Sequence, residues 1–368
     1  MRRIAIIAVT ILTILCLNIN QELVFSSSTS SVSFAGSGTI NYAVVRTKCA
    51  ITAWGWNGGV ISPLFAEQEA KFDLVSTNFE VASLAPVRSL NPSAVIIGYK
   101  DVLAEDPTME DWNVVNSHED WFYHDLNGNR IQSTTYGFYL MNISSAGWRQ
   151  HYADYVTQKI ALLGFDGVFA DDAWSELWKG VFLTAPELIP DFPDFPTQMT
   201  SFLSYVKDRI GSKLLIYNGP GNTYLSVTDG RIQEDFVYDT ARSPLTYISD
   251  LSSISSMGKY CVSWPHNVRP DTEANFLFYF SCYLLGANGD HAYFMWLDIW
   301  KTSQGYYSQM NQDVGNPKGS YYVTSEGLYT RDFDNVKVFV NLSTVSITLV
   351  FNGVSYLLPA NSGLIVNL

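Results

Sequence analysis

The sequence predicts an α/β protein, a (β/α)8 TIM barrel followed by a small C-terminal antiparallel β-sandwich domain. Two patterns carry this prediction. From residue 49 to residue 296, short β-rich runs alternate with segments in which apolar residues have helical spacing. From residue 321 onward, apolar residues instead recur at every second position, which is the period of a strand with one buried face. A doubly wound open sheet is the main alternative, but eight strands over about 250 residues fit a barrel better.

The barrel elements are expected in regular order along the chain. Strands are expected at 51–56, 72–78, 94–100, 164–171, 213–218, 231–238, 260–264 and 292–296. Helices are expected at 63–71, 148–163, 197–210, 245–257 and 272–285. The fourth strand is the most informative, because it reads Gly-Phe-Asp-Gly-Val-Phe-Ala-Asp-Asp at 164–172. Gly164 suits a helix C-cap, and the apolar run that follows suits a strand covered on both faces.

Two insertions are expected to lie on the face of the barrel where the strands end. The segment 118–131 predicts a hairpin that turns at Asn127-Gly128. The segment 184–196 contains four prolines and predicts a stiff loop that walls the same face. After a loop at 302–319, strands of the second domain are expected at 336–342, 345–351, 354–358 and 363–366. The predicted parts are a leader at 1–35, the barrel at 36–315 and the β-sandwich at 316–368.

The charge and the N-terminus restrict the partners and the location. The net charge is −13, which disfavours nucleic acids and anionic membrane surfaces as partners. Arg2 and Arg3 precede a mostly apolar run at 4–17, the pattern of a secretory signal, and this run is short for a membrane span. We therefore expect a secreted, extracellular protein and a monomer. An uncleaved anchor that keeps the protein at the cell surface is the alternative.

The cysteine and histidine pattern predicts neither a disulfide scaffold nor a metal site. Beyond the leader the cysteines are Cys49, Cys261 and Cys282, so at most one disulfide can form. There is no Cys-x-x-Cys and no His/Cys cluster with the spacing of a zinc site. We expect no metal and no organic cofactor.

Polar and aromatic side chains follow most of the predicted barrel strands at their C-terminal ends, where a barrel builds its active site. Two carboxylates among amides and aromatic rings are typical of a glycosidase, in which one attacks or stabilises the anomeric carbon and the other protonates the leaving oxygen. The catalytic candidates are Asp171, Asp172 and Glu234. The substrate-binding candidates are Trp54, Trp56, Asn78, Tyr99, Lys100, Asn218, Trp264 and Trp296, with His266 and Asp298 also at strand ends.

Several of these residues have simpler explanations. Asp171 and Asp172 are adjacent and cannot share one strand face, so Asp172 is also a candidate cap of the segment that follows. Glu234 is also explained as a surface carboxylate, and Asn218 as the start of an Asn-Gly-Pro turn. For Asp166, near the start of the fourth strand, a structural role is the favoured interpretation. The high aromatic content of 14% is compatible with a packed core or with platforms for sugar rings, and composition alone favours the core.

Three motifs resemble the (β/α)8 families of hypothetical glycosyl hydrolases, in particular the group numbered fifteen. They are the segment 164–172, Leu-Ile-Tyr-Asn-Gly at 215–219 and Asp-Gly-Arg-Ile-Gln-Glu-Asp-Phe at 229–236. The chain is more distantly similar to the endo-polygalactosaminidase and spherulin-type galactosaminidase families. The resemblance implies a retaining mechanism with Asp171 as nucleophile, Glu234 as acid/base and Asn218 as an orienting amide. Such families often have Asp-Asn where this chain has Asp171-Asp172.

The predicted function is hydrolysis of glycosidic bonds in a polysaccharide, an α-linked hexose or amino-sugar polymer, by two carboxylates. One alternative is a non-catalytic carbohydrate-binding or cell-surface structural protein built on the same barrel. The other is a transglycosylase, which would lengthen its products in the presence of an acceptor.

Overall fold

The computed structural model describes residues 49–53, 60–133, 136–238, 242–266, 268, 271–296 and 307–368. The expected leader and the candidates Trp54, Trp56 and Asp298 lie outside these ranges. Contacts separate residues 1–43 from residues 44–368, and the barrel strands and the C-terminal strands belong to the second unit. The domain boundaries drawn from the sequence stay predictions.

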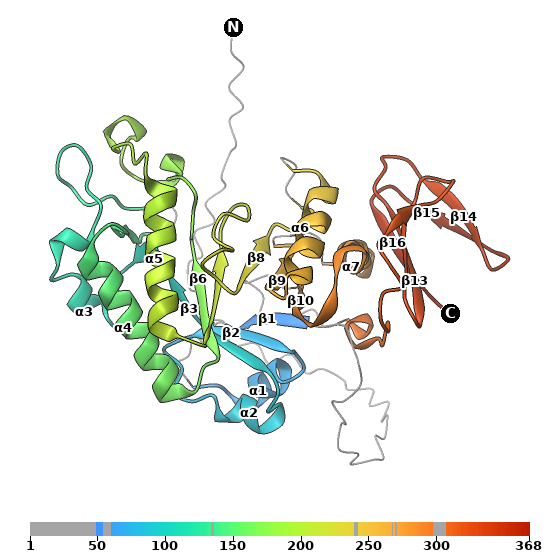
Figure 1. Cartoon of the computed structure of the whole chain (residues 1–368), viewed down its shortest axis with the longest axis horizontal. Helices are drawn as coiled ribbons and strands as arrows, with labels where there is room; N and C mark the ends of the chain where they lie inside the picture. The colour runs from blue at the N-terminus through green and yellow to red at the C-terminus, as the bar shows by residue number, and fades with distance from the viewer. Residues whose placement is uncertain are drawn as a thin grey trace, which may run out of the picture. The chain divides into compact units, whose positions relative to one another are not determined.

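A curled parallel sheet forms the centre of the second unit (Figure 1). Its strands are β1 (Cys49–Ala53), β2 (Leu74–Asn78), β3 (Val95–Asp101), β6 (Gly167–Asp171), β7 (Leu214–Asn218), β8 (Gly230–Glu234), β9 (Tyr260–Trp264) and β10 (Ala292–Met295). They lie in the order β1-β10-β9-β8-β7-β6-β3-β2, and β1 pairs with both β10 and β2. The expected α/β class is confirmed, because the sheet is parallel and curled and helices connect its strands.

Helices connect the strands of this sheet. They are α1 (Pro63–Glu69), α2 (Ala85–Leu90), α3 (Trp112–Val115), α4 (Ala146–Leu163), α5 (Phe195–Ile210), α6 (Pro244–Ser256) and α7 (Glu273–Gly286). Hydroxyl side chains cap the N-termini of α1, α4, α6 and α7, and Gly164 ends α4 in the left-handed conformation, with φ of 79°. The sequence did not predict α2, which is six residues long.

One predicted strand is shorter in the structure, and this matters for the site. The run 231–238 was expected to be strand throughout, but β8 ends at Glu234. Asp235 and Val237 have positive φ angles, of 57° and 62°, which strand geometry does not allow. The chain therefore turns directly after Glu234, and this carboxylate lies at the edge of the sheet.

The two predicted insertions pack against each other. Isolated bridges join His124 to Arg130 and Phe122 to Met141, and Gly128 has a φ of 82°, so the turn at Asn127-Gly128 is confirmed. The backbone N–H of Leu126 donates to the carbonyl of Leu188 in the proline-rich segment. A short pair of strands, β4 (Ala104–Glu105) and β5 (Tyr139–Leu140), ties this region to the end of β3.

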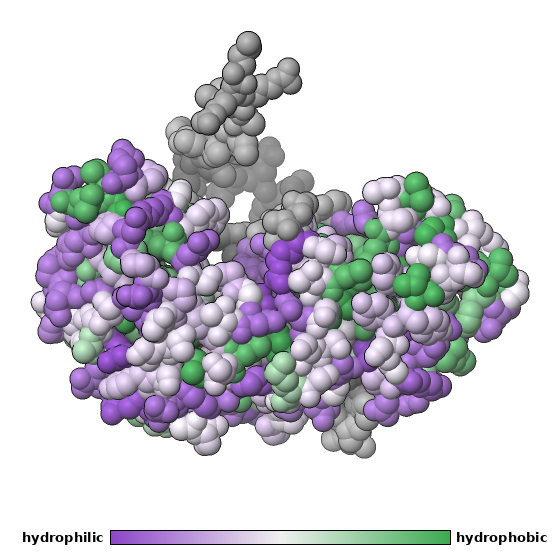
Figure 2. Space-filling model, turned by 45° about the horizontal axis from the view of Figure 1, so that its top comes forward, coloured by the Kyte–Doolittle hydropathy of each residue, from purple (hydrophilic) through white to green (hydrophobic). Residues whose placement is uncertain are grey.

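The C-terminal residues form two antiparallel sheets, as expected. One contains β11 (Tyr322–Val323), β12 (Tyr329–Asp332), β13 (Val336–Asn341) and β16 (Ser362–Asn367); the other contains β14 (Ile347–Phe351) and β15 (Val354–Leu358). Buried side chains from both sheets make a small second core of Leu328, Phe339, Leu349 and Leu358. Figure 2 shows apolar atoms on the surface over these sheets, where Val350, Val354 and Leu357 are exposed.

The described part of the chain shows no helix with the length and apolar character needed to cross a bilayer. Cys261 and Cys282 are buried and free, so neither forms a disulfide with the other.

Arg331 joins the C-terminal sheets to the barrel. Its side chain is 3% exposed, and its Nη1 donates to the carbonyls of Leu284, Leu285 and Ala287 at the end of α7, at 3.1, 3.0 and 2.8 Å. Its Nη2 donates to Asn288 Oδ1 at 2.5 Å. One guanidinium therefore satisfies carbonyl groups that the end of a helix leaves without partners.

We expect Arg331→Leu to destabilise the protein by about 3 kcal/mol, because several buried carbonyls lose their donor at once. Arg331→Lys should recover only part of this loss, since an ammonium cannot reproduce the planar fork of donors. Denaturant unfolding of the two variants measures the difference. Equal stability of Arg331→Leu and the wild type would contradict this role.

Candidate active site

Three polar residues end three consecutive strands of the parallel sheet. Asp171 is the last residue of β6, Asn218 of β7 and Glu234 of β8. Residues two apart on a strand face the same side, and the strand register places these side chains on one face. That face is the interior of the curled sheet at its C-terminal edge, the position of active sites in this class of fold.

Asn218 lies between the two carboxylates. Its Nδ2 donates to Asp171 Oδ1 at 2.9 Å and to Glu234 Oε2 at 2.6 Å. Two oxygens bound to one nitrogen at these distances are at most about 5.5 Å apart, because their separation cannot exceed the sum of both bonds. The structure thus brings together three of the residues that the sequence singled out.

His266 holds the other oxygen of Glu234. Its Nδ1 is 2.9 Å from Glu234 Oε1, and the Glu234 side chain remains 34% exposed. Burial raises the pKa of Glu234, but the hydrogen bond and charge of His266, together with the hydrogen bond from Asn218, outweigh it and bring the pKa below its usual value. Glu234 is therefore the more readily ionised member of the pair.

Asp171 has the opposite tendency. Burial, the charge of Asp101 and the charge of Glu234 raise its pKa to about 7, against the hydrogen bonds from Asn218 and Tyr99. Its Oδ1 also accepts from the backbone N–H of Asp172 at 2.9 Å. At a pH between the pKa values of Asp171 and Glu234, the two carboxyl groups together hold one proton. Without substrate, this proton resides mainly on Asp171.

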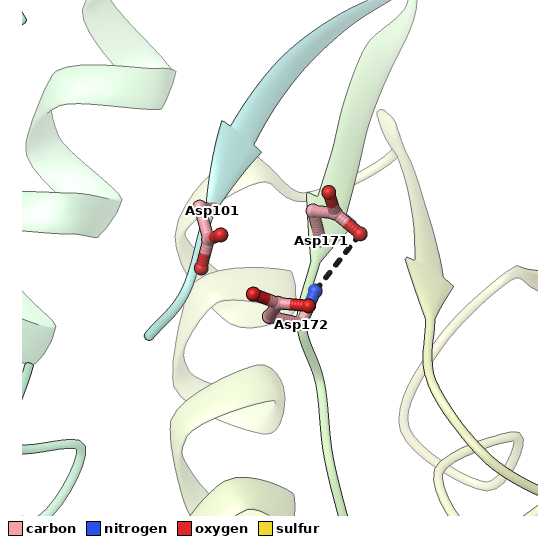
Figure 3. A group of neighbouring side chains, drawn as sticks. All are labelled: Asp101, Asp171 and Asp172. Atoms are coloured by element: carbon pink, nitrogen blue, oxygen red, sulfur yellow. Dashed lines mark hydrogen bonds between the residues drawn. The ribbon is translucent and has the colours of Figure 1, made fainter. Parts of the chain in front are cut away.

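Two further carboxylates stand beside Asp171: Asp172 and Asp101, the last residue of β3 (Figure 3). One oxygen from each of the three aspartates lies within 4.8 Å of the others. Burial and the charges of Asp101 and Asp171 raise the pKa of Asp172 well above its usual value. Asp101 is not among the candidates named from the sequence, because the predicted strand ends at Lys100, one residue too early.

The hydrogen bonds of these aspartates bear on whether the group suits a cation. In each residue Oδ1 already accepts protein N–H groups: Leu103 and Ala104 donate to Asp101, Trp174 Nε1 to Asp172, and Asn218 to Asp171. A calcium ion takes six to eight oxygen ligands, whereas each of these three carboxylates already has one oxygen bonded to protein N–H groups. Burial and the neighbouring charges also favour a retained proton on Asp172. The donor set suits a protonated carboxyl better than a metal ion.

Lys100 is not part of this group. It neighbours Tyr99 and Asp101 on β3 and therefore faces the opposite side of the strand. Its ammonium is buried in an ion pair with Glu105 and lies 3.3 Å from Asp111. The structure thus places this substrate-binding candidate between the sheet and its covering segments.

Trp296 is also directed away from the acids. Its ring is 6% exposed and lies edge-on to Phe276 of α7, with centroids 5.6 Å apart. Its Nε1 donates to Asp271 Oδ1 at 3.0 Å. The ring belongs to the core and offers little surface for stacking on a sugar.

The other aromatic candidates lie nearer the acids. Tyr99 hydrogen-bonds Asp171, and its ring lies 5.3 Å from that of Phe169. Trp264 pairs with Glu234 in the sheet and lies 4.6 Å from the ring of His266, but it is only 3% exposed. Asn78 pairs with Tyr99, which places it on the same face of the sheet.

Asp166 has a structural role, since it accepts hydrogen bonds from Arg88 Nη2 and from the backbone N–H of Ile96.

Comparison with solved structures relates this fold to glycoside hydrolases at low identity. A maltogenic α-amylase from Thermotoga neapolitana is 12% identical, with a TM-score of 0.50 over 87% of this chain and 96% of that one. Ega3 from Aspergillus fumigatus, solved with galactosamine, is 13% identical, with a TM-score of 0.48 over 70% and 92%. The glycoside hydrolase domain of PelA from Pseudomonas aeruginosa is 15% identical, with a TM-score of 0.45 over 68% and 94%.

Sequence comparison gives the family. No curated protein matches the chain. The model of a single family, described as hypothetical glycosyl hydrolase family 15, matches residues 88–337, which is more than half of the chain and includes Asp101, Asp171, Asn218 and Glu234. The chain therefore belongs to hypothetical glycosyl hydrolase family 15.

Proposed function

We propose that this protein hydrolyses glycosidic bonds with Asp171 and Glu234 as its two reacting carboxylates. The observation that carries the proposal is the bridge through Asn218, which holds an oxygen of each acid on one nitrogen at the edge of the sheet. A nucleophile or base and an acid at fixed separation are what glycoside hydrolysis requires. The proposal includes a complete (β/α)8 barrel as the scaffold.

The separation of the acids supports a retaining mechanism. Retaining enzymes keep their carboxyl groups about 5–5.5 Å apart, whereas inverting enzymes need about 6.5–9.5 Å to admit a water molecule. The bridging amide limits the bonded oxygens of Asp171 and Glu234 to the shorter range. In this mechanism the proton that the free site holds on Asp171 resides on Glu234 when the substrate is bound. Asp171 then attacks the anomeric carbon while Glu234 protonates the leaving oxygen, and Glu234 afterwards accepts a proton from the water that releases the sugar.

The charge of the site supports an amino-sugar polymer as substrate. Asp101, Asp171, Asp172 and Glu234 lie together, and within the described ranges no Lys or Arg side chain forms an ion pair with them. An anionic sugar such as a uronic acid would be repelled, whereas a sugar with a free ammonium group would gain favourable contacts. Hydrolysis of an α-linked galactosamine-like polymer fits these charges.

A glycan panel tests the function. The purified full chain is incubated with a partly deacetylated hexosamine polymer, a neutral α-glucan and a polyuronate, and new reducing ends are measured with the Glu234→Gln protein as control. We expect release from the hexosamine polymer by the wild type alone. Retention of a glycan without release would favour the carbohydrate-binding alternative, and longer products with an added acceptor would favour the transglycosylase.

The two pKa shifts predict the pH dependence of kcat/KM. The reaction needs one carboxyl of the pair protonated and the other ionised, so activity should be highest between the two pKa values. Burial, Asp101 and Glu234 raise the pKa of Asp171 to about 7, which sets the upper limb, while His266 and Asn218 hold the pKa of Glu234 low, which sets the lower limb. Activity should therefore fall as the pH rises above about 7.

His266→Gln provides the comparison for this profile. Removing the charge and the hydrogen bond of His266 lets the pKa of Glu234 rise, so the lower limb should move to higher pH while the upper limb changes less. A lower limb at the same pH in both proteins would contradict the assignment of that limb to Glu234.

We also propose that the protein is exported and acts outside the cell as a monomer. The support is the pair Arg2-Arg3 before the apolar run at 4–17. Mass spectrometry of the protein secreted by an expressing host tests this, and an intact N-terminus on a cell-bound protein would favour the anchor.

A further inference from the structure

Asp172 has an unusual backbone for its position. Its φ is 53°, in the left-handed region, which residues other than glycine adopt uncommonly. This conformation turns the chain directly after β6 and directs the N–H of Asp172 at Oδ1 of Asp171, at a distance of 2.9 Å. Other contacts must stabilise this turn, because the residue that follows a strand would otherwise adopt a more common backbone conformation.

The side chain of Asp172 has one fixed contact and two close carboxylate neighbours. Its Oδ1 accepts from the indole Nε1 of Trp174 at 2.9 Å, and one of its oxygens lies within 4.8 Å of an oxygen of Asp101 and of Asp171. Like charges this close oppose the simultaneous ionisation of all three acids. A proton shared by Asp101 and Asp172 relieves this repulsion, since a protonated carboxyl can donate to an ionised one.

The hydrogen bonds of the two residues identify which one carries the proton. Asp101 Oδ1 accepts two backbone N–H groups, from Leu103 at 2.7 Å and Ala104 at 2.8 Å, which favours the ionised form of Asp101. Asp172 has a single neutral N–H donor on Oδ1, so its other oxygen is available to carry the hydrogen. Burial raises the pKa of both acids, but the two backbone hydrogen bonds oppose the rise at Asp101, whereas the charges of Asp101 and Asp171 add to it at Asp172.

We propose that Asp172 is a positioning residue, a neutral carboxyl that donates its proton to Asp101 in a hydrogen bond and so holds the turn that aims its own backbone N–H at Asp171. That N–H and Asn218 fix Oδ1 of Asp171, and Tyr99 hydrogen-bonds the same carboxyl group, so the turn helps to set the direction of the reacting acid. This inference rests on the proposed function and identifies Asp171, rather than Asp172, as the reacting member of the adjacent pair.

The groups around Asp172 are consistent with a neutral carboxyl there. From β3 it faces Asp101, from β6 Asp171, and from β8 the charge of Glu234, all of which oppose a further negative charge. On its own segment the nearby indole of Trp174 is neutral. Lys100 favours the ionised form of Asp101, but its ammonium is committed to Glu105 and Asp111.

The first test compares Asp172→Asn with Asp172→Leu. Asn is neutral, adopts the left-handed conformation readily, and can donate to Asp101 while accepting from Trp174, so Asp172→Asn should stay within about tenfold of the wild-type kcat/KM. Asp172→Leu lacks both contacts and should lose about 100-fold or more. A loss of more than about 100-fold in Asp172→Asn would overturn the proposal, because it would show that the carboxyl itself reacts. Wild-type activity in Asp172→Leu would overturn it as well.

The second test needs no substrate and so separates this inference from the proposed function. A carboxyl whose pKa is higher in the folded state than in the unfolded state loses its stabilising contribution as the pH rises between those two values. The wild type should therefore lose Tm relative to Asp172→Asn as the pH rises above the ordinary pKa of an aspartate, about 4, since Asn does not titrate. A Tm difference that stays constant over this range would show that Asp172 is already ionised, and would refute the shared proton even if no glycan were cleaved.

Discussion

Asp171→Asn and Glu234→Gln should each lower kcat/KM for glycan hydrolysis by about 100- to 10,000-fold, the contribution of a positioned acid, base or nucleophile. Both changes keep the shape of the side chain and remove the group that reacts. Both amides can still bond the protein, so the Tm of each variant should stay close to that of the wild type. The loss should appear in kcat as well as in kcat/KM, because the missing interaction is made in the transition state.

A matched control separates this effect from the general loss of a carboxylate. Asp191 lies on the proline-rich segment, where it is exposed and pairs with Lys179, so Asp191→Asn should keep wild-type turnover. Wild-type-like turnover in Asp171→Asn or Glu234→Gln would remove that residue from the mechanism.

Azide distinguishes the two roles. In Asp171→Gly, azide can occupy the space of the missing carboxylate and attack the anomeric carbon once, so the sugar azide should have the opposite anomeric configuration to the substrate. In Glu234→Ala, the covalent sugar on Asp171 should still form with an activated substrate, and azide should then give the original configuration. The reverse pattern would assign Glu234 as nucleophile, in keeping with its lower pKa in the free site.

The sequence could predict those site residues whose position follows from lying at the end of a strand and on one face of it. Asp171, Asn218 and Glu234 each end a buried strand, and the ends of neighbouring parallel strands necessarily meet. Lys100 lies near the end of its strand, but its side chain is on the other face of the strand. Nearness to a strand end was therefore not enough to place it in the site. It sits between Tyr99 and Asp101, and only those two can share a face with Asp171.

Other features depended on information that local sequence does not contain. Asp101 was missed because its strand runs one residue beyond the apolar run, held there by pairing with Asp171 on β6. Trp296 was expected to face a substrate, but α7 supplies Phe276 on the opposite side, and tertiary packing decides the direction of such a ring. The left-handed turn at Asp172 was not predicted either, and its side chain accepts there from the indole of Trp174.

Asn218→Ala should cost about 100-fold in kcat/KM, because the amide that sets the positions of both acids is lost. Its hydrogen bonds also stabilise the ionised forms of Asp171 and Glu234, so the pKa values of both acids should rise without it. A purely structural role of Asn218 predicts lower activity with unchanged pH limbs. If Asn218 instead stabilises the ionised forms of both acids, both limbs of the kcat/KM profile move to higher pH.

Asn222→Ala is the matched control, since Asn222 lies on the same connection after β7 but binds Asp250 and Arg231, away from the acids. Its pH limbs should coincide with those of the wild type, whatever its Tm. Asn218→Asp provides the stronger form of the same experiment. A carboxylate at 218 would stand within hydrogen-bond distance of both acids, so the like charges should force at least one further proton into the site and move the upper limb higher than in Asn218→Ala. If the upper limb of Asn218→Asp coincided with that of the wild type, Asn218 would not lie between the reacting groups, and the bridge on which the glycosidase proposal depends would be lost.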